Sequence, residues 1–191
     1  MTEGFKLIIE NTADIIFQVT LTGKLTYISP SCERIADYKP EEMIGKSFTK
    51  FVPEKELPRY FSKIKEMVSG KKIDSFETYV IHRDGHLISV EFSGQIVKIK
   101  NKSFINGVLR NITERKHVEK DLQESESQLK KFVENSPIGI YRTTPDGEII
   151  MANPALVRML GYSSFEELIK CDLESTLYHP AYPRGHFKKR I

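Results

Sequence analysis

The chain repeats part of itself at a distance of 124 residues. Residues 9–38 align without gaps on residues 133–162. About two identities would be expected by chance over such a stretch from average residue usage. A period this long indicates two copies of one domain and not a solenoid, whose repeats run about 20–50 residues. The identical pairs are Glu10/Glu134, Asn11/Asn135, Ile16/Ile140, Thr20/Thr144, Gly23/Gly147, Pro30/Pro154, Arg34/Arg158 and Tyr38/Tyr162.

The first copy opens with a predicted hairpin. Short β-branched and aromatic runs at residues 15–20 and 24–29 flank Thr22-Gly23, a typical turn pair. Pro30 favours the start of a helix, because proline fits a first helical turn. Leu57, Phe61, Ile64 and Val68 follow at helical spacing and predict an amphipathic helix. After the helix that starts at Pro30, further helices are expected over residues 40–44, 48–52 and 54–68.

Three longer strands are predicted next. In the first of them, Phe76, Thr78 and Val80 alternate with polar neighbours. Asp84-Gly85 predicts a two-residue turn with positive φ at both positions. Two strands, several short helices and a three-stranded meander make an α+β domain with helices on one face of an antiparallel sheet. The three strands are expected near residues 73–82, 86–98 and 102–112.

These residues resemble the PAS/PAC sensory domain family. The matching segments are ENTADIIFQVTLTGKLTYISPSCERIADY, HRDGHLISVEFSG and GVLRNITERK, and in the second copy ENSPIGIYRTTPDGEIIMANPALVRMLGYSSFEEL. The resemblance implies a five-stranded antiparallel sheet of order 2-1-5-4-3, with helices capping a small interior cavity. It also implies a complete domain over residues 1–112, a helical linker over 113–132, and the first half of a second domain over 133–191. By the pattern of the first copy, the last three strands of the second are missing.

The apolar residues of the first copy supply candidates for a ligand pocket. Either they line a pocket for an unknown small apolar ligand, or they form an ordinary packed core. The candidates are Ile16, Ile28, Phe48, Phe61, Ile64, Phe76, Val80, Val90 and Phe92.

No haem, flavin or metal is expected. The haem-binding branch of the family has an axial histidine on the long helix, and residues 54–68 contain none. The flavin-binding branch has its cysteine in an asparagine-cysteine-arginine context, which Cys32 lacks. Cys32 is interpreted as a buried small residue and not as a reactive thiol.

Residues 113–132 contain no glycine or proline, and we therefore predict a linker helix there. Val118, Leu122, Leu129 and Phe132 follow heptad spacing, with Ser125 in the intervening slot. One interpretation is a helix that packs on its own domain. The other, implied by the family, is a two-stranded coiled coil that pairs two protomers and relays a signal. The linker follows Asn111, Ile112 and Thr113, where the family often has Asp-Ile-Thr; asparagine keeps a hydrogen bond there but no charge pair.

No catalytic arrangement is recognisable, so the chain is not expected to be an enzyme. Nucleophile, zinc-hydrolase, phosphate-loop and kinase motifs are absent from the sequence. The histidines are scattered and are interpreted as surface residues. They are His82, His86, His117, His179 and His186.

Composition points to a soluble cytoplasmic protein. Two cysteines without a CxxC pair fit a reducing compartment. A net charge of +3 does not indicate nucleic-acid binding, and the basic cluster at residues 184–190 is interpreted as a solvated helix face. Neither a signal peptide nor an apolar run of about 18 residues is seen.

The predicted function is a signal-input module. It would detect a small molecule or a conformational signal, form a homodimer, and relay the change through the linker to an output such as a histidine kinase in a longer chain. The alternatives are a ligand-free PAS module for protein interaction, and a small enzyme with an unrecognised site. Bound chromophore or small molecule in the purified protein would discriminate between them.

Overall fold

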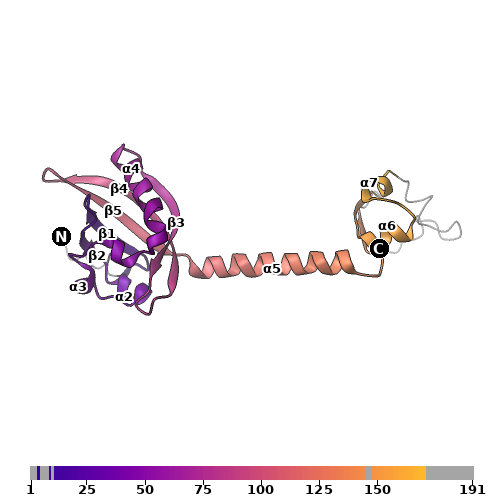
Figure 1. Cartoon of the computed structure of the whole chain (residues 1–191), viewed down its shortest axis with the longest axis horizontal. Helices are drawn as coiled ribbons and strands as arrows, with labels where there is room; N and C mark the ends of the chain where they lie inside the picture. Colours follow the sequence, from indigo (N-terminus) through magenta and orange to yellow (C-terminus); the bar gives the residue numbers. More distant parts are fainter. Residues whose placement is uncertain (1–3, 5–8, 10, 145–147, 171–191) are drawn as a thin grey trace. The chain divides into compact units, whose positions relative to one another are not determined.

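The computed structural model describes residues 4, 9, 11–144 and 148–170. Its contacts divide the chain after Glu119 into two compact units. Figure 1 shows the helices and strands of both units, coloured from the N-terminus to the C-terminus.

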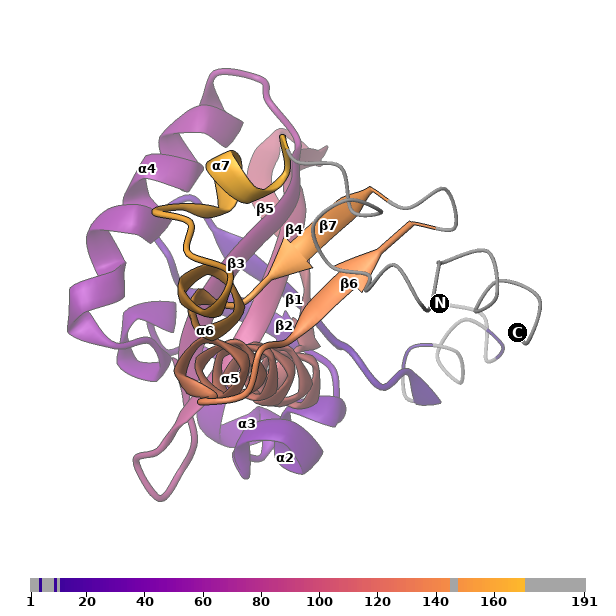
Figure 2. The same cartoon turned by 90° about the vertical axis from the view of Figure 1, so that its right-hand side faces the viewer.

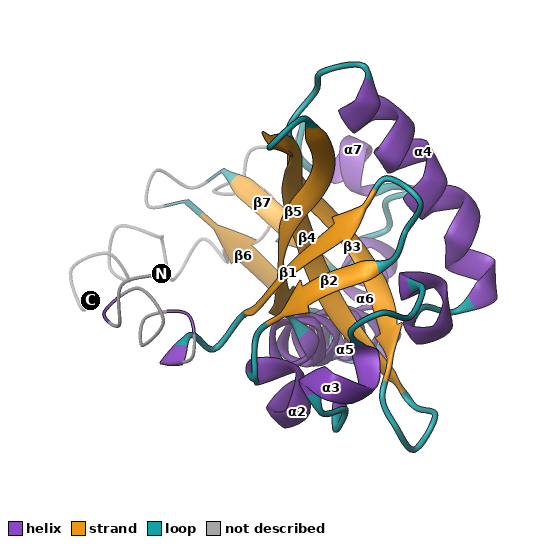
Figure 3. Ribbon diagram, turned by 90° about the vertical axis from the view of Figure 1, so that its left-hand side faces the viewer, coloured by secondary structure: helices purple, strands orange, loops and turns teal. Residues whose placement is uncertain are grey.

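The first unit contains a five-stranded antiparallel sheet of order β2-β1-β5-β4-β3. The last strand of the unit pairs with β1 on one side and β4 on the other, so the predicted fold is confirmed. The sheet is seen from two directions in Figures 2 and 3. Its strands are β1 (Ile15–Thr20), β2 (Leu25–Ile28), β3 (Ile73–Ile81), β4 (Leu87–Ile99) and β5 (Lys102–Asn111).

The helices between β2 and β3 cover one face of this sheet (Figure 3). Two of them have proline in the first turn: Pro40 starts α3, and Pro58 follows the first residue of α4, where a missing N–H breaks no intrahelical bond. Gly70, with φ +94°, follows the end of α4. The elements are α2 (Ser31–Ala36), α3 (Pro40–Met43), the 3₁₀ helices η1 (Phe48–Phe51) and η2 (Glu54–Glu56), and α4 (Leu57–Val68).

The predicted alternation of β3 is confirmed. Phe76, Thr78 and Val80 are buried, while Glu77 and Tyr79 between them are exposed. In β4, Ile88, Val90 and Phe92 are buried in the same way. Each strand therefore presents one apolar face to the helices, as a half-buried sheet requires.

The predicted apolar face of α4 is confirmed at Ile64 and wrong at Phe61 and Val68. Phe61 and Val68 are 46% and 61% exposed, whereas Tyr60, Ile64 and Met67 pack against the core. Tyr60 can face inward because its hydroxyl donates a hydrogen bond to the carbonyl oxygen of Tyr79, 3.2 Å away. A tyrosine ring thus acts as an apolar residue once its polar end has a partner.

The turn between β3 and β4 also differs from the prediction. Gly85 has φ +96°, but Asp84 does not have positive φ. The His82 N–H donates to the carbonyl of His86 (2.9 Å), and the Gly85 N–H to that of His82 (2.9 Å). The loop therefore has three residues, Arg83 to Gly85, with glycine in the left-handed position typical of such loops. The extra residue places His82 directly opposite His86.

The second unit begins within the helix α5. Within the described ranges, no helix is long and apolar enough to cross a membrane. Several residues lie outside the described part of the chain: Asp146, Gly147, Cys171, His179, His186 and the basic cluster at 184–190. The elements are α5 (Thr113–Asn135), the antiparallel pair β6 (Tyr141–Thr143) and β7 (Ile149–Ala152), α6 (Pro154–Met159) and α7 (Phe165–Leu168).

Candidate functional site

A cavity of about 90 Å³ lies between the sheet and the helices of the first unit. Strands β1, β2, β3, β4 and β5 contribute to its walls, and so do α2, α3, η1 and α4. Almost all of the lining side chains are apolar. They are Ile15, Phe17, Val19, Leu25, Ile28, Cys32, Ala36, Tyr38, Met43, Phe48, Phe51, Val52, Tyr60, Lys63, Ile64, Met67, Val80, Ile81, Phe92, Ile105 and Leu109.

The structure brings only part of the predicted set together at this cavity. Ile28, Phe48, Ile64, Val80 and Phe92 lie in its walls. These five come from β2, η1, α4, β3 and β4, so the cavity is a tertiary feature of the whole domain.

The other four predicted residues do not line the cavity. Ile16 is replaced by its neighbours Ile15 and Phe17, because successive side chains of a strand point to opposite faces. Phe61 is exposed on α4. Phe76 and Val90 are buried, at 7% and 0% exposure, but pack within the core instead of at the cavity wall.

Aromatic and sulfur-containing side chains from the helical layer were missed by the sequence interpretation. Tyr38, Met43, Tyr60 and Met67 all line the cavity. Tyr38 carried a signal, because it is one of the residues repeated in the second copy. The others carried none, since their position depends on how α3 and α4 pack.

The two ionisable groups with raised pKa at this cavity are held neutral by burial. Burial raises the pKa of the Cys32 thiol to about 11, and its Sγ contacts the carbonyl oxygen of Tyr38 at 3.1 Å. Burial also raises the pKa of Tyr60 to about 12. A protonated, fully buried thiol is a poor nucleophile, which agrees with the interpretation of Cys32 as a packing residue.

The junction between β5 and α5 is built around Ile112. Its side chain is 3% exposed, and its N–H donates to the carbonyl of Ser89 on β4 (2.9 Å). The side-chain oxygen of Asn111 accepts the N–H of Thr113 at 2.9 Å, so the expected hydrogen bond is present. Among the described residues, the buried Thr113 hydroxyl has no hydrogen-bond partner.

The charge pairs of this junction are supplied by Glu77 on β3 and not by residue 111. Its carboxylate lies 2.5 Å from Lys116 and 2.5 Å from Arg115, both in the first turn of α5. The hydrogen bond from Lys116 lowers the pKa of Glu77, and Arg115 adds to the effect. The helix is therefore tied to an edge strand of the sheet at the point where it leaves the domain.

The predicted linker seam is exposed. Val118, Leu122, Leu129 and Phe132 are 61%, 59%, 65% and 72% exposed. Within the described chain, α5 has no buried residue.

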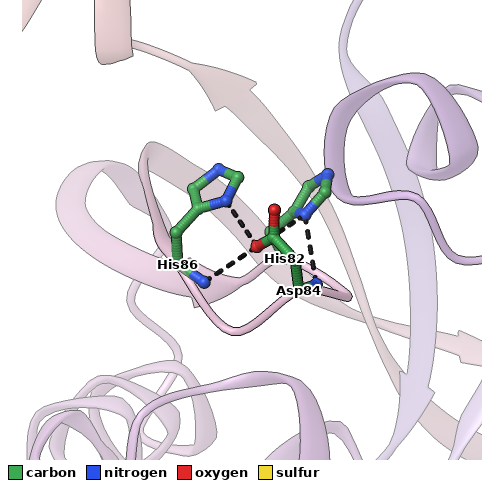
Figure 4. A group of neighbouring side chains, drawn as sticks. All are labelled: His82, Asp84 and His86. Atoms are coloured by element: carbon green, nitrogen blue, oxygen red, sulfur yellow. Dashed lines mark hydrogen bonds and ion pairs between the residues drawn. The ribbon is translucent and has the colours of Figure 1, made fainter.

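The loop between β3 and β4 carries a cluster that the sequence interpretation missed. Figure 4 shows His82, Asp84 and His86 with both rings turned toward the carboxylate. Asp84 Oδ1 lies 3.0 Å from His82 Nδ1 and 2.6 Å from His86 Nδ1. The backbone N–H of His86, then the two imidazoles, lower the pKa of Asp84 to about 2. The spacing H-x-D-x-H was the available signal.

Comparisons with known proteins match both copies of the repeat. A family model described as PAS domain matches residues 13–114, and a second model with the same description matches residues 127–190. The two matches leave residues 115–126, within α5, between them.

The relatives and solved structures agree with these matches. Sporulation kinase E of Bacillus subtilis is 26% identical over 164 residues, which cover 86% of this chain and 22% of the kinase. Sporulation kinase A of the same organism is 22% identical over 194 residues, covering 100% of this chain and 31% of the kinase. The chain thus spans less than a third of either kinase. The crystal structure of a PAS domain from Colwellia psychrerythraea, 19% identical, covers 59% of this chain and 97% of its own with TM-score 0.54.

Proposed function

The chain belongs to the PAS domain family, and from that premise we propose that it is the signal-input part of a sensor protein. The first domain detects a small apolar molecule, and the change is passed through the β5–α5 junction to the linker helix of a homodimer. The observation that carries this proposal is the apolar cavity, whose wall includes the strand that continues into α5.

The size and chemistry of the cavity define the class of ligand. An apolar cavity of about 150 Å³ admits benzene, and pockets for drug-sized ligands start at about 300 Å³. The present cavity of about 90 Å³ suits a smaller molecule unless the helices move. Its lining offers little for a charged ligand, because the ammonium of Lys63 is already paired with Glu66 at 2.7 Å.

A short path connects the cavity to the linker. Ile105 and Leu109 of β5 line the cavity, and β5 ends at Asn111, next to the buried Ile112. A shift of β5 would therefore move the start of α5 directly. The Glu77 ion pairs tie the same turn of α5 to β3.

The exposed stripe on α5 supports a second copy of the chain as its partner. Its heptad spacing is that of a two-stranded coiled coil, and each large apolar side chain contributes roughly 1.5–3 kcal/mol when it becomes fully buried. A parallel pair of α5 helices would bury all four side chains at once.

The output is proposed from the relatives. The two Bacillus subtilis relatives described above are named as kinases and extend well beyond the matched region. We therefore propose a histidine kinase or similar regulator as the output in a longer cytoplasmic chain. Within this chain we propose no catalytic role and no haem or flavin.

Two measurements test the proposal. For the ligand, native mass spectrometry of the purified full chain should show a stoichiometric small apolar molecule that is lost under denaturing conditions. An empty protein that also fails to bind short-chain hydrocarbons or small aromatic compounds would favour the ligand-free interaction module.

For the relay, Leu122→Glu should shift the chain toward monomer in sedimentation equilibrium, because it places a charge in the seam. Gln123→Glu introduces the same side chain on a neighbouring face of α5 and should leave the association unchanged. Ser125→Leu should tighten the dimer by filling the open slot. If all three variants associate to the same extent, the proposed coiled-coil relay is wrong. The first domain should keep its fold in every variant, because α5 has no buried residue.

A further inference from the structure

We propose that His82, Asp84 and His86 form a binding site for a divalent transition-metal ion, with Zn²⁺, Ni²⁺ or Co²⁺ as the fitting class. The site lies in the β3–β4 loop, outside the apolar cavity, and does not depend on the proposed ligand. It would give the domain a second, inorganic input.

The three side chains present their ligand atoms to one point. One ring nitrogen of each imidazole and a carboxylate oxygen of Asp84 all lie within 4.8 Å of one another. The imidazole rings are stacked, with centroids 4.3 Å apart and planes at 23°. Figure 4 shows that both rings turn toward the carboxylate from either side of the loop.

These distances are close to those of a metal complex. Ligand atoms bound at 2.0–2.2 Å to one ion lie about 3.0–3.5 Å apart. The His82 Nδ1–Asp84 Oδ1 distance of 3.0 Å already falls in this range. The His86 Nδ1–Asp84 Oδ1 distance of 2.6 Å is that of a hydrogen bond and must lengthen by about half an ångström. Both side chains are more than half exposed, so this small rotation meets little resistance.

The loop backbone is fixed in the conformation that the site needs. The three-residue turn holds His82 and His86 opposite each other through the His82 N–H bond to the His86 carbonyl. Between them, the Arg83 N–H donates to the carbonyl of Ala36 (3.0 Å). The Arg83 guanidinium lies 5.0 Å from the Tyr38 ring centre and also pairs with Glu42. The loop is thereby anchored to α2 and α3 before any ion binds.

The donor set selects the class of ion. Two imidazole nitrogens and one carboxylate oxygen suit zinc, nickel and cobalt, whereas calcium and magnesium require oxygen-rich sets. Three protein ligands leave coordination positions open to water or to another molecule, as in non-structural zinc sites. We therefore expect a dissociation constant on the order of micromolar, weaker than that of a closed four-ligand site.

Isothermal titration of the full chain, purified without a polyhistidine tag, tests the site with ZnCl₂ as the probe. One equivalent of Zn²⁺ should bind. Bound Co²⁺ should give a visible absorption band, which should disappear when Zn²⁺ displaces the Co²⁺. The same titration with CaCl₂ should show no saturable binding. Absence of stoichiometric Zn²⁺ binding would overturn the proposal.

Variants locate the bound ion. The double variant His82→Ala/His86→Ala should weaken Zn²⁺ binding at least about 100-fold, on the scale expected when two of three ligands are lost. Asp84→Asn removes the carboxylate but keeps a residue favoured before glycine in turns, so the fold should persist while affinity falls about 10-fold or more. His117→Ala, an exposed histidine on α5, is the control and should bind Zn²⁺ like the parent chain.

Circular dichroism melting of each variant without metal confirms that the domain is folded. Zn²⁺ should raise the melting temperature of the parent chain and of His117→Ala, but not that of the double variant. Retention of tight binding by the folded double variant, or equal loss in His117→Ala, would place the ion elsewhere and sink the proposal.

Discussion

The two copies of the repeat fix the same backbone position with different side chains. In the first copy, the Ile16 N–H donates to Ser29 Oγ at 2.9 Å. At the equivalent position of the second copy, the Ile140 N–H donates to Asn153 Oδ1, also at 2.9 Å. Both acceptors are almost completely buried. Both copies therefore share one hydrogen bond, which joins the beginning of the first strand, or the residue just before it, to the residue after the second strand.

The amide of Asn153 does more than the hydroxyl of Ser29. Its Nδ2 donates to the carbonyl oxygens of Val133 (3.0 Å) and Ile138 (2.8 Å). Its Oδ1 also accepts the Leu156 N–H at 3.0 Å and so caps α6. Val133 belongs to the last turns of α5. In the second copy, Asn153 therefore contacts the end of the linker helix, and the first copy has Ser29 at the equivalent position.

A second pair of equivalent positions exchanges volume. The first copy has Ile15 and Cys32, both buried in one core. The second has Gly139 and Leu156, and a Cβ added to Gly139 would lie 2.8 Å from Leu156 Cδ1. A large and a small residue have changed places between strand and helix. The larger residue on one side of the pair thus accompanies a smaller one on the other, as close packing requires.

The largest effect is expected for Asn153→Ala. It removes the acceptor of the Ile140 N–H, the donor to the carbonyls of Val133 and Ile138 and a helix cap, for a loss of about 3 kcal/mol in local stability. Hydrogen exchange at Ile140 and Leu156 would measure it. Asn153→Ser should lose less, because serine restores the acceptor found in the first copy but cannot donate to both carbonyls. Equal exchange in all three proteins would mean that the amide does not hold this region.

A smaller effect is expected for Gly139→Ile. The added side chain collides with Leu156, and overpacking of this kind costs about 1–3 kcal/mol. The double variant Gly139→Ile/Leu156→Cys recreates the pair of the first copy and should recover most of the loss. A double-mutant cycle on thermal or denaturant unfolding would show the coupling. Strictly additive losses would contradict the proposed exchange of volume.

The smallest effect is expected for Glu77→Gln at the opposite end of α5. It removes the pairs with Lys116 and Arg115, all of them solvent-exposed and screened by salt. Because these pairs lower the pKa of Glu77, their stabilisation is complete above the ordinary carboxyl pKa of 4.5 and disappears as the pH falls through the lowered value. Hydrogen exchange in the first turn of α5, at low and high salt, would detect the change. An unchanged rate at low salt would show that Ile112 alone holds the helix.

Local patterns predicted much of the fold. The repeat, the alternation of β3 and β4, and the glycine and proline positions gave the number and order of the elements, and the resemblance supplied the sheet order. These features follow from the period of a strand and from backbone restrictions, which adjacent residues encode. The heptad spacing of the α5 stripe is likewise a property of the sequence, whereas the exposure of its side chains is not.

The tertiary structure decided what meets in space. It turned Tyr60 and not Phe61 toward the cavity, and it removed Ile16 from the lining by strand alternation. One additional loop residue set His82 opposite His86. Asn153 found partners up to 20 positions away. Such contacts depend on how helices and loops settle against a sheet, and therefore on the packing of distant residues rather than on the order of neighbouring ones.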